Sequence, residues 1–179
     1  HVEGNPADEA GALLTVGFLK AIKAGGIDGT VAQAPSDWDR EKGMSAATDM
    51  LTARPDIQGI YGANDDVAMG VLQAVKVAGR LDDVLVVGHN GTCEALASIL
   101  KGELDMTNMI FARPIGADMI DAAIKIMHGE SVPDFIAMKV LAMDTAWANG
   151  ILDGTREDPP AAIAAETKER LERAQGGCK

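Results

Sequence analysis

The sequence is poor in positive charge and in long apolar runs, and each shortage excludes a class of protein. Lysine and arginine number 16 against 27 acidic residues, which gives the 179-residue chain a net charge of -11. A nucleic-acid backbone would be repelled by that charge, and the sequence has no basic patch to offset it. The longest apolar stretches, such as 84–88, fall far short of the roughly 20 residues that cross a bilayer. We therefore expect no nucleic-acid partner and no membrane-spanning segment.

Cysteine is also scarce, and the common catalytic motifs are missing. Cys93 and Cys178 are too few for a disulfide framework, lack His or Cys neighbours at metal-ligand spacing, and favour an interpretation as two free thiols. The chain contains no Gly-x-Ser-x-Gly elbow, no Gly-x-Gly-x-x-Gly loop and no phosphate-binding P-loop. The sequence thus predicts a protein without metal or cofactor that is not an enzyme.

What the sequence does contain is a regular alternation of apolar patterns. Helical spacing of apolar residues recurs, and three of the helices are expected to begin after the capping residues Asp39, Asn64 and Thr92. Shorter apolar runs between the helices indicate strands. The expected helices cover about 9–24, 40–54, 65–79, 92–102 and 120–127, and the expected strands about 29–33, 57–63, 84–88 and 105–111.

This order predicts an α/β fold, a doubly wound parallel open sheet with right-handed crossovers. The run Val84 to Val87 is continuously apolar, which is typical of a strand covered on both faces. The chain begins with His1, and the Val2-Glu3-Gly4 segment is typical of the end of a strand entering a loop. We therefore expect a cut, processed or fragment start, so that the fold is truncated at its N-terminus.

The pattern changes after Gly129. Residues 135–143 resemble a strand, and the acidic, proline-containing run 157–160 then breaks the chain before an alanine-rich, charged stretch. We expect this stretch to form a mostly solvated tail helix, anchored only by Ile163 and Leu171. The i,i+4 pairs that support an exposed helix are Glu166 with Arg170 and Glu169 with Arg173.

Ligands of open α/β sheets bind at the carboxyl ends of the strands, and polar or aromatic residues follow several predicted strands here. They are Trp38, Asn64 and the His89-Asn90 pair, while Ile110 lies at the end of the strand expected at 105–111. Carboxamides both donate and accept hydrogen bonds, as adjacent hydroxyls require, and an indole packs on the C–H face of a sugar ring. The combination indicates a sugar or polyol as ligand.

Each of these residues also has a purely structural interpretation. Asn64 is a good helix N-cap, Asn90 with the following glycine is a turn signal, and Trp38 can simply cover the sheet. His89 is placed to donate to a bound hydroxyl. A small α/β enzyme using His89 with Asp65 or Asp66 stays as an alternative, although both acids are expected to be solvated first-turn carboxylates.

Three sequence blocks together resemble a known family. The segments 36–40, 55–70 and 84–92 match, in order and spacing, the ribose-binding-protein type of sugar ABC transporter substrate-binding protein. The resemblance covers about residues 1–142 and identifies the chain as the second half of such a protein. It implies a periplasmic or otherwise extracytoplasmic protein that binds a monosaccharide or polyol between two α/β lobes and delivers it to an ABC transporter permease.

The resemblance also implies a division of the chain. Residues 1–110 would form the C-terminal sugar-binding lobe, and 111–131 would cross the hinge and supply a helix to the missing N-terminal lobe. Residues 132–179 would return and end in the charged tail helix. Without the other lobe, the face formed by Ile120, Ala123, Ile124 and Met127 is expected to lie exposed or to pack in a non-native way.

The family's binding residues carry over only in part. Trp38 matches the ring-stacking aromatic residue and Asn64 the sugar-binding asparagine, whereas Asn90 replaces an aspartate that binds hydroxyls. Leu14 stands where the family has a sugar-binding arginine, and Ile110 where it has a glutamine. Loss of charge-assisted hydrogen bonds implies a ligand that is less polar than ribose or differently substituted.

Two points stay open. His89 occupies a position that is often aromatic, and Arg113 is a candidate to replace a lost polar group. The effector-binding domain of a LacI-type transcription regulator is the main alternative, because it shares the fold and several motifs. Against it, the segment 80–84 lacks the proline that is typical before this strand in regulators.

Overall fold

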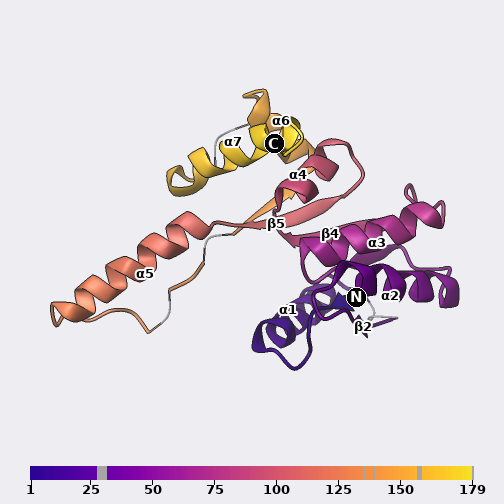
Figure 1. The fold of residues 1–179 in the computed structure, drawn as a ribbon, viewed down its shortest axis with the longest axis horizontal. Coiled ribbons are helices and arrows are strands. Elements are labelled where there is room, and N and C mark those ends of the chain that lie inside the picture. The colour runs from indigo at the N-terminus through magenta and orange to yellow at the C-terminus, as the bar shows by residue number, and fades with distance from the viewer. Residues whose placement is uncertain (28–31, 135, 139, 157–158, 179) are drawn as a thin grey trace.

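The computed structural model describes residues 1–27, 32–134, 136–138, 140–156 and 159–178 (Figure 1). The chain alternates between strands and helices as far as α5, and ends in a strand and two further helices. The strands are β1 Val2–Glu3, β2 Ala34–Pro35, β3 Gly59–Tyr61, β4 Leu85–Asn90, β5 Met106–Ile110 and β6 Val140–Asp144. The helices are α1 Glu9–Ala24, α2 Arg40–Ala53, α3 Asp65–Val77, α4 Cys93–Leu100, α5 Ala112–Met127, α6 Thr145–Leu152 and α7 Ala161–Gln175.

The strands form a mostly parallel sheet. β1 pairs with β2, and β3 to β6 form a second set in the order β3-β4-β5-β6. A parallel bridge between Val2 and Gly62 joins β1 to β3, so the strand order is β2-β1-β3-β4-β5-β6. The predicted doubly wound class is confirmed. β6 runs antiparallel to β5, which sequence patterning did not indicate.

Polar caps start the helices at the carboxyl edge of the sheet. Asp39 accepts a hydrogen bond from the backbone N–H of Lys42, and Asn64 accepts one from Val67, each at 2.8 Å. Thr92 accepts one from Ala95 at 3.3 Å. All three predicted caps are confirmed, and each stabilises its helix by about 1 kcal/mol.

The two faces of the sheet are covered unequally. Val84 and Val86 are buried, and α3 packs so closely against this face that a Cβ on Gly88 would lie 3.1 Å from the Cβ of Ala68. Leu85, on the opposite face, is 60% exposed. The expectation that this strand is covered on both faces is therefore wrong for Leu85, because α1 covers only part of its side of the sheet.

Two expected strands fall partly outside the described residues. The strand expected at 29–33 coincides largely with residues 28–31, and the described strand lies slightly later, at β2. Positions 135 and 139 of the expected segment 135–143 are likewise outside, and β6 occupies its end. Helix α6 was not predicted from the sequence.

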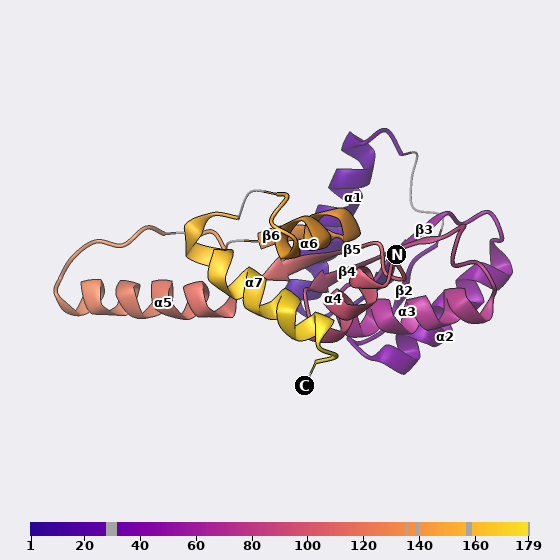
Figure 2. The same cartoon turned by 90° about the horizontal axis from the view of Figure 1, so that it is seen from above.

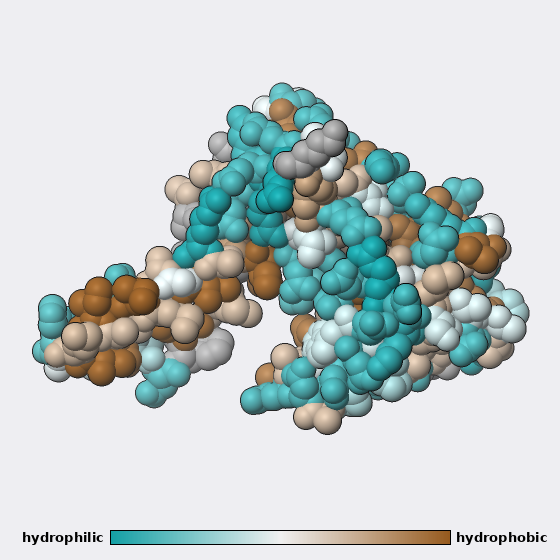
Figure 3. All heavy atoms as spheres, viewed as in Figure 1, coloured by the Kyte–Doolittle hydropathy of each residue, from teal (hydrophilic) through white to brown (hydrophobic). Residues whose placement is uncertain are grey.

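Helix α5 stands apart from the sheet (Figures 1 and 2), and none of its residues is buried. Apolar side chains gather over it (Figure 3), as the expected exposed face requires. The large exposed apolar residues on this helix are Met119, Ile120, Ile124, Ile126 and Met127.

The tail helix α7 differs from the expected solvated helix. Ile163 and Leu171 are buried, as predicted, but so are Thr167 and Ala174, and the helix packs against α4. Because these residues recur at helical spacing, α7 buries a whole face rather than two anchors.

The ion pairs of α7 also differ in part from those expected. The Arg170–Glu166 pair, at 3.6 Å, is largely shielded from solvent. Glu169 pairs at 2.7 Å with Arg113 of α5 and not, as expected, with Arg173.

A disulfide joins Cys93 to Cys178, so the expectation of two free thiols is wrong. The two Cα atoms lie 5.8 Å apart, although 85 positions separate the residues in sequence. The packing of α7 on α4 brings the end of the chain back to the first turn of α4, which sequence spacing alone does not reveal.

Candidate functional site

The carboxyl ends of β1 to β5 meet at one edge of the sheet, where ligands of open α/β folds bind. The strand order reverses direction between β1 and β3, because the chain first moves from β1 to β2 and then returns past β1 to β3. The crevice at such a reversal is the usual binding position. Here it lies between the loop that follows β1 and the residues that follow β3.

Trp38 is fixed at this crevice by two contacts. Its indole Nε1 donates to Asp8 Oδ2 at 2.9 Å, and its ring lies so close to Gly4 that a Cβ there would come within 2.5 Å of ring atoms. The backbone φ of Trp38 is +64°, in the left-handed region that non-glycine residues rarely adopt. The ring is half-buried, so part of its surface stays accessible.

Asp8 contacts the candidate site through the Trp38 indole, and the sequence patterns did not point to it. It caps α1 by accepting hydrogen bonds from the backbone N–H groups of Ala10 and Gly11. The Gly11 N–H and the Trp38 indole hold the pKa of this carboxyl below its usual value. Asp8 is therefore an anion that both starts the helix and orients the indole. An aspartate just before a helical apolar pattern was the sequence signal for the cap.

Asn64 is a helix cap, and its contacts leave the second interpretation, a sugar-binding asparagine, available. Its Oδ1 caps α3, while no hydrogen bond within the part of the chain that the structure describes uses its amide N–H groups. The side chain is half-buried beside the crevice. The cap therefore uses the Oδ1 acceptor of Asn64 and leaves its two amide N–H donors available to a ligand.

His89 and Asn90 end β4. Asn90 has a φ of +117°, which is unusual for a residue with a side chain. Burial lowers the pKa of His89, although the nearby carboxylate of Asp65 opposes that shift. The imidazole is therefore neutral at pH 7, and its buried Nδ1 has no partner among the described residues.

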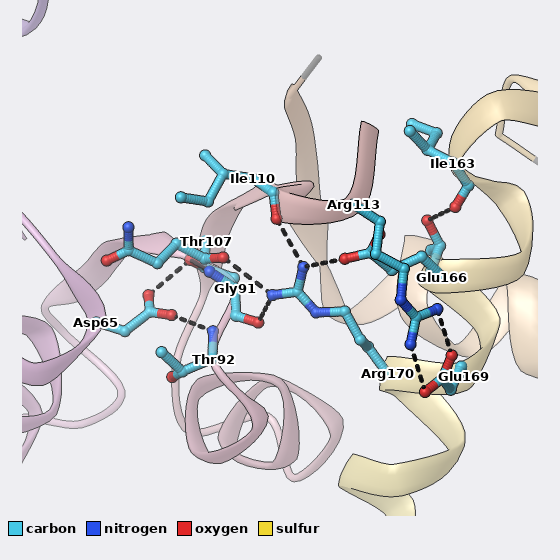
Figure 4. A network of polar contacts seen from close by, with 12 residues as sticks. Asp65, Gly91, Thr92, Thr107, Ile110, Arg113, Ile163, Glu166, Glu169 and Arg170 are labelled. Carbon is cyan, nitrogen blue, oxygen red and sulfur yellow. Dashed lines mark hydrogen bonds and ion pairs between the residues drawn. The ribbon is translucent and has the colours of Figure 1, made fainter. Parts of the chain in front are cut away.

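Asp65 lies beneath this edge and is buried, so the expectation of a solvated carboxylate is wrong for it. It accepts hydrogen bonds from Thr107 Oγ1 at 2.6 Å and from the Thr92 N–H at 2.5 Å (Figure 4). Burial raises its pKa, and these two donors oppose the increase. Asp66 is exposed, as expected, and pairs with Arg40 at 2.8 Å.

The remaining predicted positions are apolar or engaged elsewhere. Leu14 lies half-buried on α1, and Ile110 lies half-buried at the end of β5. Arg113 was a candidate to replace a lost polar group, but its guanidinium donates twice to Glu169, at 2.7 and 3.0 Å.

A cavity of about 530 Å³ lies away from this edge, between α1 and the exposed face of β3 and β4. Tyr61 stacks there on the rings of His1 and Phe18, which are tilted against each other, and the ring centroids lie 4.6 to 5.2 Å apart. Burial raises the pKa of Tyr61 to about 12. The lining is mostly apolar and offers few groups for hydroxyls, so the strand ends fit a polyol better than this cavity does.

The described residues contain no group of three or more His, Cys, Asp or Glu side chains that could hold a metal ion. In the same residues, no helix has the length and apolar character that crossing a membrane requires.

Comparison with known proteins identifies relatives for most of the chain. The family described as "Periplasmic binding protein domain" matches residues 1–131. The ribose import binding protein of Salmonella typhimurium is 37% identical over 116 residues, which are 65% of this chain and 38% of that protein. The D-allose-binding periplasmic protein of Escherichia coli is 37% identical over 140 residues, which are 75% of this chain and 45% of that protein.

Solved structures show the same relationship. An ABC transporter solute-binding protein from Actinobacillus succinogenes with bound D-allose superposes with a TM-score of 0.77 at 29% identity, over 83% of this chain and 52% of that one. One from Bacillus halodurans with bound myo-inositol gives 0.72 at 25% identity, over 94% and 53%. This chain thus spans about half the length of these solved relatives. By its sequence match over residues 1–131 and by its fold, it belongs to the periplasmic binding protein family, as the sequence blocks predicted.

Proposed function

We propose that this chain is the sugar-binding lobe of a substrate-binding protein that serves an ABC-type importer. A monosaccharide or polyol would lie at the crevice between β1 and β3, with a ring face on Trp38 and hydroxyls accepting from the Asn64 amide. The observation that carries the proposal is this pairing of a fixed, half-exposed indole with free amide donors at the reversal of strand order.

The chemistry of the neighbouring positions narrows the ligand class. Leu14 and Ile110 offer no side-chain hydrogen bonds, and Asn90 carries no charge. The acidic group at the crevice, Asp8, is already used by the indole and by α1. A ligand with fewer or differently placed hydroxyls than ribose fits such an edge best, because buried hydroxyls without partners weaken binding.

The remaining parts of the proposal concern the rest of the protein. Residues 1–110 would form the ligand-binding lobe, and α5, within 111–131, would pack its apolar face on a second lobe. That second lobe is the half of the relatives' length that this chain does not span. Closure of the two lobes on the ligand would create the surface that a permease recognises.

The disulfide supports an extracytoplasmic location. Disulfides persist in oxidising compartments such as the periplasm and are rare where thiols are kept reduced. The named relatives are import and periplasmic binding proteins, which supports the transport function over the regulator alternative.

The test is a nuclear magnetic resonance titration of the chain with D-allose, D-ribose and myo-inositol at millimolar concentrations. The indole N–H signal of Trp38 is predicted to shift. That of Trp147, which lies on α6 under Arg156, serves as the internal control. Asn64→Ala is expected to weaken the response and Asn149→Ala, an exposed change on α6, to leave it unchanged. No shift at Trp38 with any of the three ligands, here and in a co-expressed two-lobe form, contradicts the proposal.

A further inference from the structure

A single arginine of the tail helix reaches the carboxyl ends of two neighbouring strands. Arg170 Nη1 donates to the carbonyl of Ile110 at 2.7 Å, and Nη2 donates to the carbonyl of Asn90 at 3.0 Å and to that of Gly91 (Figure 4). Asn90 and Ile110 are the last residues of β4 and β5, and Gly91 directly follows β4. Two of the three acceptor residues, Asn90 and Ile110, stand at positions of the proposed ligand edge.

The surroundings of Arg170 are built to hold a cation there. Its side chain is largely shielded, with Glu166 at 3.6 Å and the guanidinium carbon 5.9 Å from the ring centroid of Phe111. Burial lowers the pKa of Arg170, yet a guanidinium stays protonated in proteins. Charged donors form stronger hydrogen bonds to carbonyls than neutral donors do, so the contact resists exchange with water.

The backbone at the end of β4 needs such support. Asn90 has a φ of +117°, and residues in this region persist only where their surroundings hold them. At Gly91, a Cβ would lie 2.5 Å from Met109 and 3.0 Å from Arg170 Nη2. The absence of a side chain at Gly91 therefore makes space for the guanidinium of Arg170. Through its hydrogen bonds, Arg170 connects the strained turn at Asn90 and Gly91 to the end of β5.

The position of Arg170 depends in turn on how α7 is attached. Leu171 and Ala174 of α7 are buried and anchor the helix. The disulfide between Cys178 and Cys93 fixes the end of the chain to the start of α4. Removal of the guanidinium alone therefore leaves α7 in place. A substitution of Arg170 therefore tests the role of its guanidinium without removing α7.

We infer that Arg170 is a positioning residue for the ligand edge: it sets the backbone of Asn90 and Gly91 against that of Ile110, so that the tail helix and its disulfide form part of the binding apparatus. The effect on ligand affinity rests on the proposed function. The effect on the backbone of Asn90 does not, and it is measured without any ligand.

The experiment compares Arg170→Met with Arg173→Met, an exposed arginine on the same helix. In Arg170→Met, the backbone φ of Asn90 is expected to change. The change would appear in the three-bond HN–Hα coupling constant and in the backbone chemical shifts of Asn90. The amides of Gly91 and Thr92, which donate to Thr107 and Asp65, should exchange with solvent at least about tenfold faster. The Gly62 amide, bonded to Val87 at 2.9 Å, should exchange at an unchanged rate in both variants.

A sugar titration completes the comparison. If D-allose binds the parent chain, its dissociation constant is expected to rise about fivefold to tenfold in Arg170→Met, as for a lost hydrogen bond at the site, and to stay constant in Arg173→Met. If Asn90 changes as expected but no sugar binds the parent, the positioning inference stands and the proposed function fails. If Arg170→Met only lowers the melting temperature, with Asn90 signals and affinity unchanged, the inference is wrong.

Should the methionine variant not fold, Arg170→Lys replaces it. A lysine ammonium cannot span both strand ends, so the same changes are expected.

Discussion

Loss of the bond between Cys93 and Cys178 is predicted to lower the free energy of unfolding by about 4.5 kcal/mol. The residues are 85 positions apart, and the chain-entropy relation for a loop of that length gives a stabilisation of this size. Since 1 kcal/mol corresponds to about 2 to 4 °C for a protein of this length, the melting temperature should fall by roughly 9 to 18 °C.

The assay is thermal and urea unfolding of the parent, of the parent with reductant, and of the double variant Cys93→Ser with Cys178→Ser. The sequence contains only these two cysteines, so reductant acts on a single bond. The double variant should match the reduced parent and show no further response to reductant. The reasoning would be refuted if reductant changed the melting temperature by less than about 2 °C and the unreduced unfolded chain had two titratable thiols. The thiols would show that the bond is absent.

Three further predictions each concern a single residue. Gly4→Ala places a Cβ against the Trp38 ring, so it should lower the free energy of unfolding by about 1 to 3 kcal/mol and shift the indole fluorescence. An unchanged fluorescence spectrum would argue against that contact. Burial lowers the folded-state pKa of His89, so the free energy of unfolding should fall as the pH drops from above 6.5 towards that pKa. His89→Gln should flatten this dependence, and equal pH profiles for the parent and the variant in urea titrations would refute the prediction. Ile124→Lys on the exposed face of α5 should reduce binding of a hydrophobic dye severalfold without lowering the melting temperature, and unchanged dye binding would show that this face is covered.

The parts of the fold that depend on local interactions were predictable from the sequence. Caps are side-chain contacts to backbone two or three positions away, so Asp39, Asn64 and Thr92 identified the starts of their helices. The helix at 9–24 was predicted with the same bounds that α1 has in the structure. Alternation of helices and strands was sufficient for the fold class.

The wrong predictions involve partners that are distant in sequence. Asp65 was expected in solvent because its neighbours in sequence give no hint of Thr107, 42 positions away. The disulfide and the contacts of Arg170, up to 80 positions away, depend on the path of α7 across α4. Leu85 was misplaced because an apolar run does not say which helices reach each face.

The same distinction applies to the candidate site. Trp38 and Asn64 were placed at the ligand edge because Asn64 directly follows a predicted strand and Trp38 lies in the short loop after another. Asp8, which orients the indole, lies 30 positions from Trp38 and was missed. Its contribution required the geometry of the loop after β1.

The titration of the Trp38 indole N–H signal with D-allose, D-ribose and myo-inositol tests the central claim most directly. The expected result is a saturable shift at Trp38 that Asn64→Ala weakens, with the Trp147 signal unmoved. The contradictory result is a Trp38 signal that does not move with any of the three, in the single chain and in a co-expressed two-lobe form. The carboxyl edge of the sheet would then not be a sugar site.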